Sequence, residues 1–228
     1  MTPLIIAAIV SGCAAEAVFI VFEYRKNWLP ALLLKSAASV LFLLVGFLAM
    51  RLSADASYAR LIFIGLALGA VGDVCLNLRN LCGGRARLVF MLGIAAFLLG
   101  HLCYIWALAV RAPGALLYAA IACVPVSFAV IRFVLRRVNV DGALKIFGVI
   151  YLVIVLLMAC LAVTLLVFDP GSGAYRLFAL GGLLFAASDV LLVLNQFGKR
   201  AYPAFRALNL SLYYLGQIGI ALTIALMR

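Results

Sequence analysis

Hydrophobic positions along this chain form eight long runs that are separated by short polar connections. A helix needs about 20 apolar residues to cross a bilayer, and each run meets that length. The connections are too short to contain a soluble domain. We therefore predict an all-α polytopic membrane protein, in which residues 1–228 form a single transmembrane domain. It is a bundle of eight transmembrane helices near 3–22, 29–50, 58–78, 88–110, 114–135, 143–168, 174–196 and 203–227.

Composition supports membrane insertion. Hydrophobic residues make up 69% of the chain and charged residues 11%, whereas a soluble domain carries about 25% charged residues.

Pro30 and Pro203 mark the starts of two runs, as expected for a residue without a backbone N–H. The first run follows no basic segment and is too long for a cleavable signal peptide, so we interpret it as a true span.

The net charge of +11 would suggest a nucleic-acid partner in a soluble protein, but here the basic residues follow the connections. Twelve lie in the first, third, fifth and seventh connections, and five lie on the other side, where Arg228 is counted. By the positive-inside rule we predict that both termini lie outside the cytoplasm, and we expect the membrane to be a bacterial inner (cell) membrane. No nucleic acid is expected, although the basic connections could bind anionic membrane lipids. The twelve are Arg25, Lys26, Arg79, Arg85, Arg87, Arg132, Arg136, Arg137, Lys145, Lys199, Arg200 and Arg206.

Two aspartates, Asp73 and Asp189, lie inside predicted spans in similar local sequence, as Gly72-Asp73-Val74 and Ser188-Asp189-Val190. A carboxylate within a membrane helix costs roughly 2.5–3.5 kcal/mol on insertion scales, and such residues usually mark function. Because the two aspartates are 116 positions apart, we predict that they form a carboxylate pair created by an internal repeat.

The same offset of 116 relates further residues. Lys35 corresponds to Tyr151, and Gly100-His101 corresponds to Gly216-Gln217. Four spans separate each pair, so the halves are predicted to be two parallel four-helix repeats related by an axis along the membrane normal. The alternative is a chance match between apolar segments.

Other intramembrane polar residues fall at similar predicted depths. Glu16, Lys35, His101 and Gln217 could converge with the aspartates on one cavity that opens toward the inner leaflet. Roles outside a functional site remain open for three of them. The Lys35 side chain could extend to the membrane interface, His101 could be a packing residue, and Glu16 could be structural.

The sequence contains no soluble-enzyme motif, and its single histidine excludes a histidine-rich metal site. We expect no metal and no cofactor. A carboxylate pair in an apolar cavity instead favours general acid–base chemistry, in which one carboxyl group is protonated while its partner is ionised.

Several of these segments resemble the YhhN family, whose characterised members are integral-membrane lysoplasmalogenases. The resemblance implies a hydrolase of lipid metabolism that cleaves the vinyl ether bond of a lysoplasmalogen. The products would be a fatty aldehyde and glycerophosphoethanolamine or glycerophosphocholine. The matching residues are Lys35, Gly72-Asp73-Val74 with Leu76, His101-Leu102-Cys103-Tyr104-Ile105, Tyr151 with Met158, Phe185-Ala186-Ala187-Ser188-Asp189 and Tyr213-Tyr214-Leu215-Gly216-Gln217.

If the resemblance holds, Asp73 and Asp189 are the catalytic acid and base, without a choice between them. Lys35 would bind the substrate phosphate or a carboxylate, and the apolar bundle would hold the alkenyl chain. The partners would be a lysophospholipid within the bilayer and membrane lipids, and we favour a monomer. The expected orienting residues are Lys35, His101, Tyr104, Tyr151, Ser188, Tyr213, Tyr214, Gln217, Asn77, Asn195 and Glu16.

Two alternatives stay open at this point. One is a metal-dependent hydrolase of another lysolipid, with Asp73, Asp189 and His101 as ligands. The other is a small proton-coupled transporter in which parallel halves share a protonatable pair.

Overall fold

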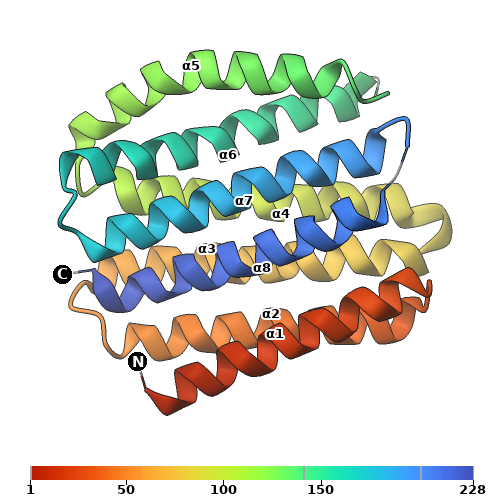
Figure 1. The fold of residues 1–228 in the computed structure, drawn as a ribbon, viewed down its shortest axis with the longest axis horizontal. Coiled ribbons are helices and arrows are strands. Elements are labelled where there is room, and N and C mark those ends of the chain that lie inside the picture. Colours follow the sequence, from red (N-terminus) through yellow and green to blue (C-terminus); the bar gives the residue numbers. More distant parts are fainter. Residues whose placement is uncertain (1, 141, 201, 228) are drawn as a thin grey trace. The chain divides into compact units, whose positions relative to one another are not determined.

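The computed structural model describes residues 2–140, 142–200 and 202–227, with the side chain of residue 143 left out. Arg228, one of the five basic residues counted on the second side, lies outside the described residues. Within the described part, eight long helices without strands confirm the predicted all-α membrane fold (Figure 1). They are α1 (Pro3–Tyr24), α2 (Trp28–Met50), α3 (Ala56–Leu78), α4 (Ala86–Ala109), α5 (Pro113–Leu135), α6 (Gly142–Phe168), α7 (Gly173–Phe197) and α8 (Pro203–Leu226).

Local sequence explains where several helices begin. Pro3 and Pro113 occupy the first turns of α1 and α5, where a missing N–H costs no hydrogen bond. The carboxylate of Asp55 caps α3 by accepting 2.9 Å bonds from the backbone N–H groups of Ser57 and Tyr58. Inside a bilayer the backbone must satisfy its own hydrogen bonds, so the long apolar runs fold as uninterrupted helices, and α5 continues through Pro125.

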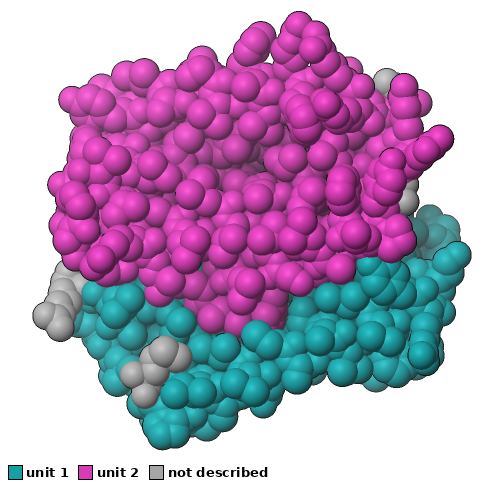
Figure 2. Space-filling model, viewed as in Figure 1, with its two compact units in different colours: residues 1–104, 220–228 teal, residues 105–219 magenta. Residues whose placement is uncertain are grey.

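The chain divides into two compact units (Figure 2). Unit 1 contains residues 1–104 and 220–228, and unit 2 contains residues 105–219. In unit 1, α1 packs on α2 and α2 packs on α3, whereas in unit 2, α5 packs on α6 and α6 packs on α7. The boundaries fall within α4 and α8, so each of these helices contributes residues to both units.

Large apolar side chains are exposed along the helices, as a lipid-facing surface requires. Val124 and Phe128 of α5 are each 69% exposed, and Leu33 of α2 is 62% exposed. A water-soluble protein rarely tolerates such contiguous apolar surface. The core of each unit is also apolar, with Phe42 and Leu66 fully enclosed in unit 1. Polar side chains within the spans are therefore the exception, and most of those predicted to be functional are buried.

The helix bounds repeat with the offset found in the sequence. Adding 116 to the bounds of α2, α3 and α4 gives 144–166, 172–194 and 202–225. The observed bounds of α6, α7 and α8 are 142–168, 173–197 and 203–226. The agreement extends over three successive helices and their connections, whereas α1, shifted by 116 to 119–140, does not match α5 at 113–135.

Close glycine contacts repeat with the same offset. A Cβ atom added to Gly100 of α4 would lie 3.0 Å from the carbonyl oxygen of Gly65 in α3. A Cβ atom added to Gly216 of α8 would lie 2.9 Å from the carbonyl oxygen of Gly181 in α7. In both units, glycine allows two helix backbones to approach closely, as small residues do in membrane bundles. The two units thus share a helix-packing motif as well as sequence spacing.

Candidate functional site

In unit 1, Lys35 of α2 lies in a buried ionic cluster. Its ammonium nitrogen donates bonds of 2.9 and 3.1 Å to the two carboxylate oxygens of Glu16 in α1. Asp73 Oδ1 of α3 lies 3.8 Å from the same nitrogen. Lys35 is only 2% exposed, so it does not extend to the membrane interface. Of the roles considered for Lys35, pairing with carboxylates is the one found.

The second oxygen of Asp73 contacts a residue that the sequence analysis did not single out. Ser39 of α2 donates a 2.6 Å hydrogen bond to Asp73 Oδ2. Its hydroxyl also lies 3.0 Å from the carbonyl oxygen of Lys35, one turn earlier in the helix. Lys35 and Ser39 therefore present an ammonium group and a hydroxyl group to one carboxylate. Each carboxylate oxygen of Asp73 therefore faces a polar side chain of α2.

Asn77 and His101, two further predicted site residues of unit 1, each form a hydrogen bond within their own helix. Asn77 is buried and donates a 2.9 Å hydrogen bond to the carbonyl oxygen of Asp73, one turn earlier. His101 Nδ1 lies 2.6 Å from the carbonyl oxygen of Phe97 within α4, and its ring packs edge-on against Tyr104. Tyr104 is 1% exposed and covers Gly65. These contacts fix His101 and Tyr104 in the core of unit 1.

In unit 2, Asp189 of α7 faces Tyr151 of α6. The Tyr151 hydroxyl donates a 2.7 Å hydrogen bond to Asp189 Oδ2. Asp189 is 3% exposed, and within the described residues Tyr151 is its hydrogen-bond partner. This carboxyl group thus has a neutral phenol beside it, whereas Asp73 has an ammonium group. The two aspartates share a sequence frame and differ in chemical environment.

Ser188, which precedes Asp189, is held by a second residue that sequence reasoning missed. Asn209 of α8 donates 2.8 Å hydrogen bonds to both the carbonyl oxygen and the hydroxyl of Ser188. The amide oxygen of Asn209 in turn accepts a 3.1 Å bond from Arg206. These bonds tie the backbone immediately before Asp189 to α8. A polar stripe at Asn209, Tyr213 and Gln217, spaced by four residues, was the available sequence signal for Asn209.

The other predicted residues of unit 2 divide into two groups. Gln217 donates a 3.2 Å bond to the hydroxyl of Tyr213, and Tyr213 packs edge-on against Phe185. Tyr214 is 1% exposed in the same helix. Asn195 has a different position, because its side-chain oxygen accepts a 2.7 Å bond from the backbone N–H of Tyr202 in the connection to α8. Asn195 therefore organises a connection and is not brought to Asp189.

Side-chain partners follow the internal repeat. Lys35 approaches Asp73, and the residues 116 positions later, Tyr151 and Asp189, are bonded to each other. Likewise, His101 bonds one turn back to the carbonyl of Phe97, and their counterparts Gln217 and Tyr213 are also bonded. Corresponding positions thus contact each other in both units, while the chemical identity of the partners differs.

The unit 1 cluster places two carboxylates against one ammonium group, and unit 2 places one carboxyl group against a phenol. Such groups can hold and transfer protons, and carboxyl groups are common general acids and bases. Within the described ranges, no three histidine, cysteine, aspartate or glutamate side chains are close enough together to hold a metal ion.

Comparison with known proteins gives one assignment. The model of the YhhN family matches residues 31–224, which includes all the predicted site residues except Glu16. No curated protein and no solved structure matches the chain. Because the match covers most of the sequence and both aspartates, this chain belongs to the YhhN family.

Proposed function

We propose that this protein is a membrane hydrolase that cleaves the vinyl ether bond of a lysoplasmalogen. Family membership and the buried Tyr151–Asp189 hydrogen bond support the proposal. The Tyr151–Asp189 hydrogen bond indicates the mechanism. Vinyl ether hydrolysis begins with proton transfer, and Asp189 has a carboxyl group in apolar surroundings. We assign to Asp189 the role of general acid, which the sequence alone left open.

The reaction consumes one water molecule. Asp189 donates its proton to the alkene carbon that is not bonded to the ether oxygen, and the remaining cation is shared between carbon and oxygen. Water adds to that cation, and its proton returns to the carboxylate, so the acid is regenerated. The resulting hemiacetal then breaks its bond to the glycerol oxygen, which takes up the hydroxyl proton. The products are a fatty aldehyde and a glycerophospho head group.

The contacts of Asp189 suit a proton donor. Tyr151 donates to Oδ2, which leaves Oδ1 to carry the proton. General acid catalysis by a positioned carboxyl group contributes typically 10²–10⁴-fold to a rate. The hydrogen bond from Tyr151 also stabilises the carboxylate that forms when the proton leaves, because a donor to an ionised acceptor makes a stronger bond.

Asp73 suits a different role. Its two oxygens face the Lys35 ammonium group and the Ser39 hydroxyl, so neither oxygen is left to carry a proton toward a substrate. We propose that Asp73 and Glu16 together fix Lys35. That the two aspartates act on the same substrate molecule stays a prediction.

The test is aldehyde release by the purified full-length protein, measured by mass spectrometry. The substrates are a lysoplasmalogen and its alkyl-ether and ester analogues with identical chains. We expect aldehyde from the vinyl ether and no cleavage of the alkyl ether, because only the alkene can be protonated to a stabilised cation. Asp189→Asn keeps the size and the acceptor for Tyr151 but has no acidic proton, so the rate should fall about 100-fold or more.

Three outcomes would contradict the proposal. Full activity of Asp189→Asn would remove Asp189 from the chemistry. Cleavage of the ester analogue alone, particularly if a chelator abolished it, would indicate a metal-dependent hydrolase of another lysolipid. Accumulation of intact lysolipid in proteoliposomes without product would indicate transport. Asp169→Asn, in the connection before α7, is the matched control and should retain full activity.

A further inference from the structure

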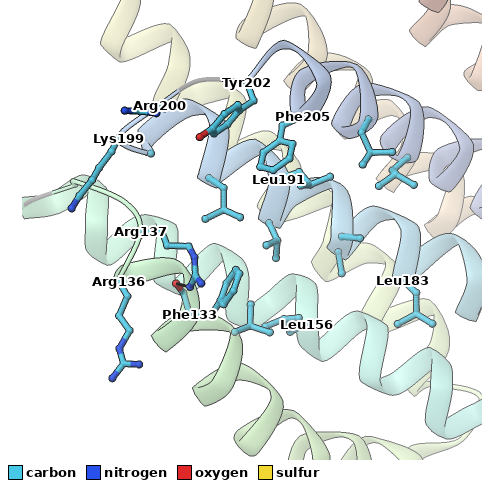
Figure 3. Close-up of a pocket in the computed structure, with 18 residues that line it drawn as sticks. Phe133, Arg136, Arg137, Leu156, Leu183, Leu191, Lys199, Arg200, Tyr202 and Phe205 are labelled. Carbon is cyan, nitrogen blue, oxygen red and sulfur yellow. Dashed lines mark hydrogen bonds between the residues drawn. The ribbon is translucent and has the colours of Figure 1, made fainter.

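Unit 2 contains an apolar groove with a basic end, and neither feature belongs to the Tyr151–Asp189 contact. The groove has a volume of about 1150 Å³ and is lined by residues of α5, α6, α7 and α8 (Figure 3). Leu156 forms part of its wall at 7% exposure, and Leu183 is half exposed beside it. Asp189 is not among the lining residues. The groove exceeds the roughly 300–1,000 Å³ of most small-ligand pockets.

Four cations line one end of the groove. Arg136 and Arg137 follow the end of α5, and Lys199 and Arg200 follow the end of α7. In Figure 3 these four residues lie toward one end of the view, while Leu183 lies toward the other. Arg137 also stacks on Phe133, with 3.7 Å between the guanidinium carbon and the ring centroid. The groove is therefore amphipathic along its length.

Backbone pairing holds the two basic connections together. The N–H of Asn139 donates a 2.9 Å hydrogen bond to the carbonyl oxygen of Phe197, and Val138 and Gly198 form an antiparallel bridge. A Cβ atom at position 198 would collide with the carbonyl oxygen of Leu194 in the last turn of α7, so the chain leaves this helix through a glycine. The bond from Tyr202 to Asn195 further fixes the second connection. The positive-inside rule explains basic connections, but it does not explain why two of them are joined.

Four like charges gathered at one end of a groove attract an anion. Among residues 2–140, 142–200 and 202–227, none of the four cations forms an ion pair with a carboxylate. Arginine side chains bind phosphate groups through paired hydrogen bonds. The apolar part of the groove, formed by residues such as Leu191 and Leu208, requires a hydrocarbon chain as its occupant.

We propose that this groove binds an anionic phospholipid of the membrane. The phosphate and any further negative charge of the head group lie at Arg136, Arg137, Lys199 and Arg200. An acyl chain lies along α7, past Leu191 toward Leu183. Lipids with a net negative charge are preferred over zwitterionic lipids because four cations face the head group. The site is separate from the proposed hydrolysis, since neither Tyr151 nor Asp189 lines the groove.

Lipid binding to the purified full-length protein tests the proposal. Native mass spectrometry would measure the affinity for phosphatidylglycerol and for phosphatidylcholine with the same acyl chains. We expect the wild type to prefer phosphatidylglycerol. Changing the four cations to glutamine, as Arg136→Gln, Arg137→Gln, Lys199→Gln and Arg200→Gln, should lower phosphatidylglycerol affinity about tenfold or more and abolish the preference. An unchanged preference in this variant would overturn the proposal.

A matched variant separates a specific site from general surface charge. Arg25→Gln, Lys26→Gln, Arg85→Gln and Arg87→Gln remove the same number of charges from connections predicted to face the same side. This variant should retain the lipid preference. If it lost the preference to the same extent, the effect would be that of net charge, and the groove would not be a specific site.

A third comparison tests the apolar part of the groove. Leu183→Trp should obstruct the chain position and weaken phosphatidylglycerol binding, because Leu183 lines the groove. Leu180→Trp, one turn earlier on α7 and similarly exposed, does not line the groove and should bind as the wild type does. Equal binding by Leu183→Trp would overturn the placement of the chain. Both variants should show the same helical circular dichroism, which establishes that they are folded.

Discussion

The Tyr151 hydroxyl donates a 2.7 Å hydrogen bond to Oδ2 of Asp189, and both residues are 116 positions beyond a contacting pair in the other unit. That pair is Lys35 and Asp73. Helices that correspond under this offset thus carry an ammonium–carboxylate contact in one unit and a phenol–carboxyl contact in the other. The difference suggests that the two aspartates have separate tasks, one as a fixed carboxylate and one as a proton donor.

Removing the Tyr151 hydroxyl should slow catalysis without unfolding the protein. In Tyr151→Phe, Asp189 loses the donor that stabilises its carboxylate after proton transfer. A hydrogen bond to a charged group contributes about 1.5–3 kcal/mol, so aldehyde release should fall roughly 10–100-fold. Tyr118→Phe, at an exposed position of α5, serves as the control and should have the wild-type rate. A Tyr151→Phe enzyme with the wild-type rate would contradict the role of the hydrogen bond.

Removing Lys35 should destabilise unit 1. Lys35→Met leaves Glu16 and Asp73 buried without their shared cation. Breaking a buried ion pair on one side costs about 3–5 kcal/mol, so the midpoint of thermal unfolding in detergent should fall markedly. The double variant Glu16→Gln with Lys35→Met removes one of the two orphaned charges and should recover part of the loss. If the double variant were less stable than Lys35→Met, Glu16 would not depend on Lys35.

The glycine contacts should be equally sensitive to a methyl group in both units. Gly100→Ala and Gly216→Ala each place a Cβ atom about 3 Å from a carbonyl oxygen of the facing helix. Because backbone atoms cannot move aside easily, each change should lower stability by about 1–3 kcal/mol. Gly148→Ala in α6 is the matched control, since no atom lies within 4 Å of its added Cβ, and it should be neutral or stabilising. Thermal unfolding in detergent measures all three. A marked loss in one unit alone would show that the repeated contact does not have a common packing role.

The amount of fold that could be predicted from sequence follows from the physics of the bilayer. Eight apolar runs had to become eight helices, because only helices satisfy the backbone within a run. Proline positions such as Pro30 and Pro203 then set helix starts to within a few residues. The offset of 116 was also visible in the sequence, and the helix bounds and glycine contacts support an internal repeat. The predicted membrane side of each terminus stays a prediction.

The sequence by itself determined that Asp73 and Asp189 lie within membrane spans, where the cost of a charge in lipid favours an enclosed partner. Only the tertiary structure decided which side chains are the partners. Glu16 and Ser39 reach the Lys35–Asp73 contact from α1 and α2, and Asn209 reaches Ser188 from α8. Asn195, in contrast, binds its own connection. Partner choice depends on helix rotation and packing between segments distant in sequence, and hydrophobic pattern specifies neither at the level of single side chains.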